Sequence, residues 1–149
     1  MQEIWKDIKG YEGLYQISNL GNVKSLPRKV NKRKCEEIIK VPTISNKGYY
    51  RISLCKNGKI KYYAIHRLVA EAFMPNYDNL PCVNHKDCDT KNNNVDNLEW
   101  ITYKDNNNYK NHHLKTHIGY VISFLKNNYK DRIDLIQKLE DLREEINNL

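Results

Sequence analysis

Residues 83–108 constrain the fold of this chain most, because they place polar side chains at fixed intervals among short apolar runs. His85 follows Asn84 directly, Asn97 lies twelve residues further on, and Asn106 lies nine residues after that. Amide oxygens can ligate a hard divalent cation, and a neutral imidazole can activate water near neutral pH. This combination favours phosphodiester cleavage over most other chemistries.

The local pattern around these residues predicts strand, loop, strand and helix in that order. Strands are expected over 82–85 and 98–102, with a polar loop over 86–97 between them. A helix is expected to follow and to run to about Leu114, with Thr102 as a plausible N-cap.

The part of the chain before this hairpin has the pattern of short antiparallel strands. Alternating apolar residues predict two β-hairpins, over 15–26 and 49–65. The second turns at an Asn-Gly pair, which is a strong short-range hairpin signal. Helical spacing then begins at His66, and Pro75 follows its end.

The C-terminal tail has a different pattern. Apolar residues continue at helical spacing from Ile118 to Leu149, with a break near Asn127 and Asn128. An amphipathic helix is therefore expected. A coiled coil that forms a homodimer and packing against the chain's own core both fit this pattern.

Length and composition exclude several classes of protein. The 149 residues have room for one modest domain, or for one compact domain with an extension. No run is long enough to span a membrane, and the N-terminus lacks the apolar core of a signal peptide, so we expect a cytosolic protein. The four cysteines form no CxxC pair, which gives a zinc ribbon little support and predicts free thiols.

The positive charge lies in the N-terminal part of the chain. Residues 1–65 hold 14 Lys and Arg against 5 Asp and Glu, whereas the whole chain has a net charge of +7. One basic cluster contains no acidic residue between its members, which are Lys24, Arg28, Lys29, Lys32, Arg33 and Lys34. Such a cluster fits a phosphate backbone, and a solvated lysine-rich loop is the alternative.

The other histidines are weaker signals. His66 opens a predicted helix and is interpreted as a packing or capping residue rather than a ligand. His112, His113 and His117 have the spacing HHxxxH, but no further ligand pattern supports a zinc site. They are interpreted as solvated or phosphate-facing.

Two stretches of the sequence resemble known families. Residues 65–73 (IHRLVAEAF), 84–87 (NHKD), 97–100 (NLEW) and Asn106 together resemble the HNH endonucleases of phage and intron origin. Residues 3–26 resemble the modular DNA-binding motif often found ahead of such nucleases. The resemblance covers residues 3–26 and about 64–110.

The resemblance to the HNH endonucleases implies a role for each residue of the motif. His85 would be the general base, and Asn84 and Asn106 would ligate Mg²⁺ (or Mn²⁺). Asn97 would bridge the loop and orient His85. The chain departs from its relatives at Asn84, where many have Asp, at Asn106, where others have His, and at Cys88, where Gly is usual.

The expected fold class is α+β: a small antiparallel β-sheet region (1–63), a ββα-metal motif (64–115) and a C-terminal amphipathic helical tail (116–149). The expected function is a metal-dependent DNA endonuclease of homing type. It would be encoded by a phage or mobile element and would act on double-stranded DNA in the cytoplasm of a bacterial host. The alternatives are a catalytically inactive DNA-binding protein and, from the tail alone, a coiled-coil interaction protein.

Overall fold

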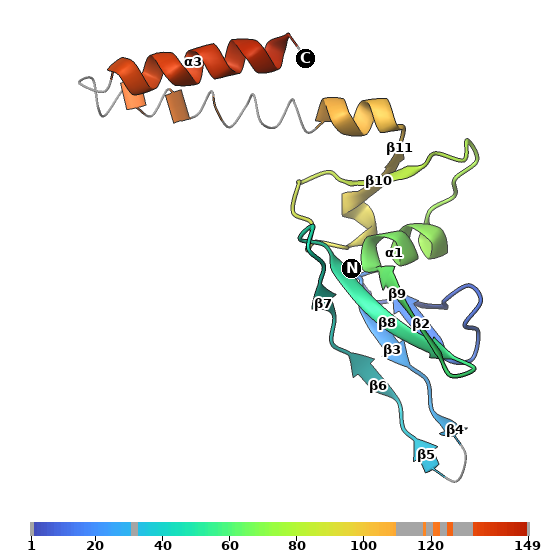
Figure 1. Ribbon diagram of the computed structural model, residues 1–149. Helices are drawn as coiled ribbons and strands as arrows, with labels where there is room; N and C mark the ends of the chain where they lie inside the picture. The colour runs from blue at the N-terminus through green and yellow to red at the C-terminus, as the bar shows by residue number, and fades with distance from the viewer. Residues whose placement is uncertain are drawn as a thin grey trace. The chain divides into compact units, whose positions relative to one another are not determined.

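The computed structural model describes residues 2–30, 33–109, 118, 121–122, 125–126 and 133–148. The chain forms two compact units, Met1–Ile101 and Thr102–Leu149, and each is described by itself. Small antiparallel sheets and helices make up the structure, so the prediction of an α+β fold is confirmed (Figure 1).

The first unit begins with a four-stranded antiparallel sheet. Its strands are β1 (Trp5–Asp7), β2 (Tyr15–Ser18), β3 (Val23–Ser25) and β6 (Ile38–Lys40), in the order β1-β2-β3-β6. The predicted hairpin between β2 and β3 is confirmed, with Ile17 paired to Val23. Both of these side chains are buried and contribute to the core.

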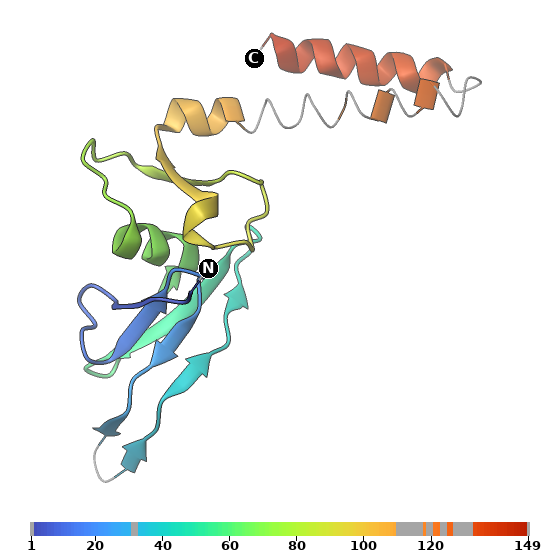
Figure 2. The same cartoon turned by 180° about the vertical axis from the view of Figure 1, so that it is seen from behind.

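A second, two-stranded hairpin interrupts this sheet between β3 and β6. It consists of β4 (Arg28–Val30) and β5 (Arg33–Cys35), which pair antiparallel. Both views of the ribbon show it projecting beyond the sheet that it interrupts (Figures 1 and 2). The sequence pattern did not predict this hairpin, because its residues are mostly charged and do not alternate with apolar ones.

A three-stranded sheet follows, with the order β7-β8-β9. Its strands are β7 (Thr43–Ile44), β8 (Tyr50–Lys56) and β9 (Lys59–Ala64). The predicted β8–β9 hairpin is confirmed. Its turn residues, Asn57 and Gly58, have φ of 52° and 73°, the positive values that a two-residue hairpin turn requires.

Helix α1 (Ile65–Phe73) continues directly from β9 and packs against β2, β8, β9, β10 and β11. Apolar side chains at helical spacing cause this packing, because Leu68 and Val69 are buried together with Ile17, Ile52 and Leu98. Residues of the predicted segment 1–63 therefore share one hydrophobic core with residues 65–98 of the next segment.

The predicted strands of the key hairpin are confirmed. They are β10 (Cys82–His85) and β11 (Leu98–Ile101), which pair antiparallel and are joined by a loop that ends in the short helix η1 (Val95–Asn97). The second strand ends one residue earlier than predicted. This ribbon carries the motif residues of the first unit.

The second unit is helical where the structure describes it. Residues 103–109 are helical, and Thr102 Oγ1 accepts a hydrogen bond from Asp105 N at 3.1 Å, which confirms the predicted N-cap. The predicted extension of this helix to Leu114 lies outside the described residues.

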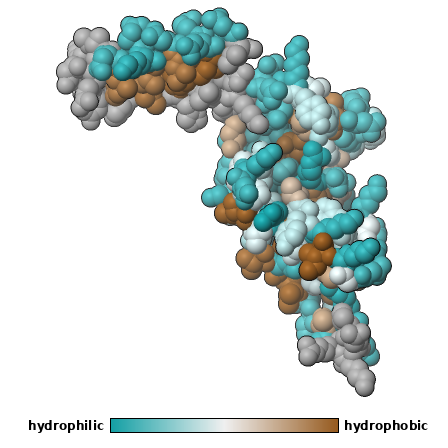
Figure 3. Space-filling view, viewed as in Figure 1, coloured by the Kyte–Doolittle hydropathy of each residue, from teal (hydrophilic) through white to brown (hydrophobic). Residues whose placement is uncertain are grey.

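Helix α3 (Ile133–Asn147) follows in the same unit and packs against Ile118, Ile122 and Leu125. Ile136 and Ile146 are buried with Ile118 and Ile122, so apolar positions of the tail contact one another within the chain. Figure 3 shows the matching hydrophobic band beneath the polar outer face of α3. Among the described residues, no helix is both long enough and apolar enough to span a membrane.

Candidate active site

His85 is the last residue of β10, and its side chain is buried. Its Nε2 lies 3.2 Å from Oδ1 of Asn93. The Asn93 amide nitrogen donates to the Lys91 carbonyl at 3.0 Å, so the amide oxygen faces the histidine and can only accept. His85 Nε2 therefore carries the proton of the neutral ring, and Nδ1 keeps the lone pair that a general base needs.

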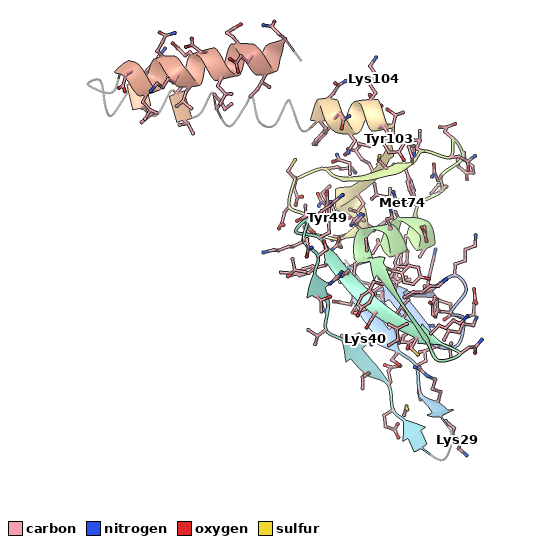
Figure 4. All side chains as sticks on the ribbon, in the orientation of Figure 1. Lys29, Lys40, Tyr49, Met74, Tyr103 and Lys104 are labelled. Atoms are coloured by element: carbon pink, nitrogen blue, oxygen red, sulfur yellow. The ribbon has the colours of Figure 1, made fainter. Side chains whose placement is uncertain are left out.

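Two further rings surround His85. The His66 and Tyr49 ring centroids lie 5.2 and 6.0 Å from that of His85, and 5.0 Å from each other. Figure 4 labels Tyr49 just before β8, on the side of the sheet where α1 begins. These contacts restrict the rotation of the His85 ring and fix the direction of Nδ1.

His66 was expected to be either a packing residue or a helix cap, and the structure shows it packed in the interior. Ala64 is the N-cap of α1, so His66 does not cap the helix. Burial lowers the pKa of His66 to about 4, and the nearby His85 and Arg67 add to this effect. His66 is therefore a neutral neighbour of His85 at physiological pH. Its buried Nδ1 has no hydrogen-bond partner among the described residues.

Asn97 ties together the loop that follows His85. Its Oδ1 accepts from Asp87 N at 3.1 Å, and its Nδ2 donates to Asp87 Oδ1 at 2.8 Å and to the Asn92 carbonyl at 2.9 Å. Burial acts to raise the pKa of Asp87, but the hydrogen bonds from Asn92 and Asn97 outweigh it and leave this pKa below its usual value. Asn97 thus contacts the loop and not the imidazole.

The turn after His85 requires an unusual backbone conformation at Cys88. Its φ is 63°, and its N–H donates to the His85 carbonyl at 3.0 Å. Glycine adopts this left-handed conformation without the steric cost that a side chain brings. The conformation accounts for the glycine that the resemblance led us to expect at this position. Burial raises the pKa of the Cys88 thiol, and the neighbouring Asp87 carboxylate adds to the effect.

The N-terminal sheet supports the loop that holds His85. A Cβ atom on Gly21, whose φ is 87°, would lie 2.8 Å from the Cβ of Asn93, so only glycine allows this approach. Val95 N also donates to the Asn19 carbonyl at 2.8 Å. Sequence reasoning missed Asn93, because an Asn-rich run is typical of turns and only the fold brings Gly21 against it.

Asn84 is buried and pairs with Glu99 across the ribbon. Its Nδ2 donates to Glu99 Oε1 at 2.8 Å, which leaves its amide oxygen without a hydrogen bond from any described residue. A hard cation prefers oxygen ligands, so this free oxygen suits Mg²⁺ or Mn²⁺. The described residues contain no group of three or more His, Cys, Asp or Glu side chains that could hold a metal.

Asn106, the other predicted ligand, lies in the second unit on helical residues 103–109. Its side chain is half-buried, and its backbone N–H donates to the Thr102 carbonyl at 3.0 Å. The amide therefore comes from the first turn of a capped helix. Its oxygen has the same chemistry as that of Asn84.

Some side chains of the predicted basic cluster are bound to other residues of the protein, and others are exposed. Arg28 donates to the Leu14 carbonyl at 3.0 Å and to Tyr15 OH at 3.0 Å, so its guanidinium supports the fold. Lys24 is paired with Glu37 at 3.4 Å. Lys29 is exposed on the projecting hairpin (Figure 4).

The remaining members of the basic cluster are Lys32, Arg33 and Lys34. Lys34 is exposed and lies 3.1 Å from Glu36. Lys32 and the side chain of Arg33 lie outside the described part of the chain.

A second basic surface was missed by sequence reasoning. A hollow of about 390 Å³ lies beside the β8–β9 turn, lined by four lysines and two tyrosines: Lys9, Lys56, Lys59, Lys61, Tyr11 and Tyr63. The hydrogen bond between the two tyrosines, together with burial, raises the pKa of Tyr11 to about 12. Lys56, Lys59 and Lys61 belong to the β8–β9 hairpin, and only the fold brings Lys9 beside them.

These features define a class of protein. A strand-end histidine within a strand–loop–strand unit, followed in the chain by a capped helix, is the ββα arrangement that the sequence predicted. Comparison with known proteins agrees, because residues 3–55 match the NUMOD4 motif and residues 63–108 match the HNH endonuclease family. These matches support an HNH endonuclease that resembles the homing endonucleases of this family.

Individual relatives support this assignment. DNA endonuclease I-HmuI of Bacillus phage SP01 is 47% identical over 102 residues, which are 68% of this chain and 54% of the relative. An uncharacterized HNH endonuclease of Acanthamoeba polyphaga mimivirus is 41% identical over 105 residues, covering 70% of this chain and 29% of the relative. This chain spans about half the length, or less, of these curated relatives.

A solved structure agrees with the sequence relatives. The structure described as DNA binding and cleavage by the HNH homing endonuclease I-HmuI matches with a TM-score of 0.59 and 42% identity, over 72% of this chain and 57% of that one. HNH nucleases generally depend on divalent metal ions.

Proposed function

We propose that this chain is a divalent-metal-dependent endonuclease that nicks or cleaves double-stranded DNA as a homing endonuclease. The observation that carries the proposal is the hydrogen bond from His85 Nε2 to Asn93, which leaves Nδ1 unprotonated. A neutral imidazole held in one direction is suited to take a proton from water near neutral pH.

The proposed mechanism assigns a task to each motif residue. His85 Nδ1 takes the proton of the attacking water, and Asn93 keeps the ring in the tautomer that allows this. Asn97 holds the loop after His85 in place through Asp87. Asn84 and Asn106 would hold Mg²⁺ (or Mn²⁺) through their amide oxygens. A cation held there would supply electrostatic stabilisation of charge on the phosphate and on the leaving 3′ oxygen.

Two basic surfaces of the first unit are proposed to contact the DNA backbone. Lys29 and Lys34 extend from the β4–β5 hairpin, and four lysines line the hollow beside the β8–β9 turn. Lysine contacts to phosphates release counterions and give affinity without sequence preference.

The biological setting is also part of the proposal. We infer from the phage relative that the protein acts in the cytoplasm of a bacterial host. A homodimer through the C-terminal helix stays a prediction. Leu135 and Leu142 support it, because they are exposed and lie one heptad apart on α3.

Nicking of supercoiled plasmid, with Mg²⁺, with Mn²⁺ and with a chelator, tests the proposed function. We expect His85→Ala to lower the nicking rate by about 10²- to 10⁴-fold, the usual contribution of a general base. DNA binding measured by fluorescence anisotropy should stay at the wild-type level. A His85→Ala rate within about tenfold of wild type, less than 1.4 kcal/mol of barrier, would remove this residue from the role.

The same assay separates the enzyme from its alternative. Wild-type protein that binds duplex DNA but leaves the plasmid supercoiled with either cation is a DNA-binding protein without nuclease activity. Wild-type protein that nicks only with a divalent cation is the proposed enzyme.

A further inference from the structure

Glu99 contacts one of the two proposed cation ligands. It lies directly opposite Asn84 in the β10–β11 ribbon, so the two side chains share one face. The Asn84 amide nitrogen donates to Glu99 Oε1 at 2.8 Å. Neither Asn84 nor Asn106 carries a charge, whereas Glu99 brings a carboxylate into direct contact with the first of them.

The contact determines which atom of the Asn84 amide is free. A carboxylate accepts hydrogen bonds and donates none, so the amide nitrogen must face Glu99. Turning the amide over would place two oxygens against each other with no proton between them. Glu99 therefore selects the orientation in which the Asn84 oxygen is available to a cation.

The same contact brings negative charge to the site. Two amide oxygens attract a divalent cation only through their dipoles, whereas a carboxylate attracts it through a full charge. Glu99 is half-buried, and charges in such places are screened by salt less than exposed ones. Its charge therefore acts on any cation that Asn84 binds.

We propose that Glu99 is a positioning residue of the cation site, which orients the amide of Asn84 and supplies the negative charge that the two asparagine ligands lack. The proposal rests on the proposed function in one respect, namely that Asn84 is a ligand. A pair that only stabilised the ribbon would affect unfolding and leave cation affinity unchanged.

Binding of Mn²⁺ to the full chain tests this proposal. The free Mn²⁺ signal in electron paramagnetic resonance gives the affinity, with the protein alone and with a short duplex. Glu99→Gln keeps the shape of the side chain and removes its charge. We expect it to weaken Mn²⁺ binding by about 10- to 100-fold, as is typical when a partner of a metal ligand is lost.

Glu71→Gln is the matched control, because it removes the same charge from an exposed position on α1. Its Mn²⁺ affinity should equal that of the wild type. If Glu99→Gln also binds Mn²⁺ as the wild type does, the proposal is wrong.

The double variant Asn84→Asp/Glu99→Gln exchanges the carboxylate and the amide across the ribbon. The amide nitrogen of the introduced glutamine can then donate to the carboxylate of the introduced aspartate, so the pairing and the total charge are kept. We expect Mn²⁺ affinity equal to that of the wild type or tighter. Affinity that stays as low as in Glu99→Gln would overturn the proposal, and this variant carries the test alone if circular dichroism shows that Glu99→Gln does not fold.

Plasmid nicking in parallel separates this proposal from the proposed function. A wild type that binds Mn²⁺ but does not nick DNA contradicts the nuclease function, while the Mn²⁺ affinities still test Glu99. A wild type that nicks, with a Glu99→Gln variant that binds Mn²⁺ normally, contradicts only the role of Glu99.

Discussion

At the scale of single residues, the chemistry of His85 is set by the three side chains that contact its ring. Asn93 determines which ring nitrogen carries the proton, and Tyr49 and His66 restrict the ring. Because His66 is buried and neutral, it places no positive charge beside His85. A second imidazolium at this distance would oppose protonation of His85 when it acts as a base.

The neutral state of His66 makes the stability of the protein depend on pH. Its pKa is about 4 in the folded protein and 6.5 in the unfolded chain, so between these values the unfolded chain binds more protons. The stabilisation is present above 6.5 and is lost as pH falls toward 4. We expect His66 to contribute a loss on the order of 3 kcal/mol to the free energy of unfolding.

Urea unfolding of the wild type and of His66→Phe at several pH values measures this contribution. The phenylalanine cannot titrate, so the free energy of unfolding should fall less steeply on acidification in the variant. Comparing the two proteins cancels the carboxylates that titrate in both. Equal pH dependence in the two proteins would contradict the lowered pKa of His66.

At the scale of secondary-structure elements, two hairpin turns carry exposed lysines. The β4–β5 hairpin presents Lys29 and Lys34, while Lys56 and Lys59 flank the β8–β9 turn. Lys34 is paired with Glu36, and Lys56 Nζ donates to the Gly10 carbonyl at 2.6 Å. Arg28 is held by more partners, because its guanidinium donates both to the Leu14 carbonyl and to Tyr15 OH. Replacing Arg28 would therefore disturb the fold as well as any contact with DNA.

We expect both turns to contribute to the salt dependence of DNA binding. Two variants test this, one with Lys29 and Lys34 changed to Gln and one with Lys9, Lys56, Lys59 and Lys61 changed to Gln. Each lost phosphate contact should lower the magnitude of the slope of log affinity against log salt by about 0.9. Fluorescence anisotropy at several salt concentrations gives the slope.

Lys138→Gln on α3 is the control for net charge, because Lys138 is exposed in the other unit. If a turn variant has the same slope as this control, that turn faces solvent in the complex. Because each turn has its own variant, the prediction is tested for each turn separately.

At the scale of the whole molecule, the first unit depends on both of its sequence motifs. Ile17 and Ile52 come from the N-terminal segment, and Val69 and Leu98 come from the nuclease motif, yet all are fully buried in one core. Removing residues 1–63 would expose the inner face of α1 to water. Each large apolar side chain loses about 1.5–3 kcal/mol when its burial is lost.

We therefore expect the fragment 64–149 to lack the native β10–β11 ribbon when it is made alone. Amide proton dispersion in NMR spectra of the fragment and of the full chain measures this. The full chain should show dispersed signals for residues 82–101, and the fragment should not. A fragment with native dispersion there would mean that the nuclease motif folds by itself.

Local residue patterns were enough to predict much of this protein. The alternation of apolar residues predicted β10 and β11, the Asn-Gly pair predicted the β8–β9 turn, and Thr102 was correctly expected to cap a helix. These features depend on residues within a few positions of one another. The spacing of the motif residues also indicated a resemblance to the HNH endonucleases, whose family model matches residues 63–108.

Contacts between distant segments could be found only in the tertiary structure. Asn93 faces His85 because Gly21 allows the N-terminal sheet to approach the loop, and Glu99 meets Asn84 because the ribbon register places them opposite each other. Arg28 is a structural residue because Tyr15 and the Leu14 carbonyl surround it. Sequence by itself determined the β2–β3, β8–β9 and β10–β11 hairpins, helix α1 and the cap at Thr102. Only the packing of remote segments decided which ring nitrogen of His85 carries the proton, how the Asn84 amide is oriented and that the Arg28 guanidinium is bound within the protein. Each of these depends on a partner that no local pattern specifies.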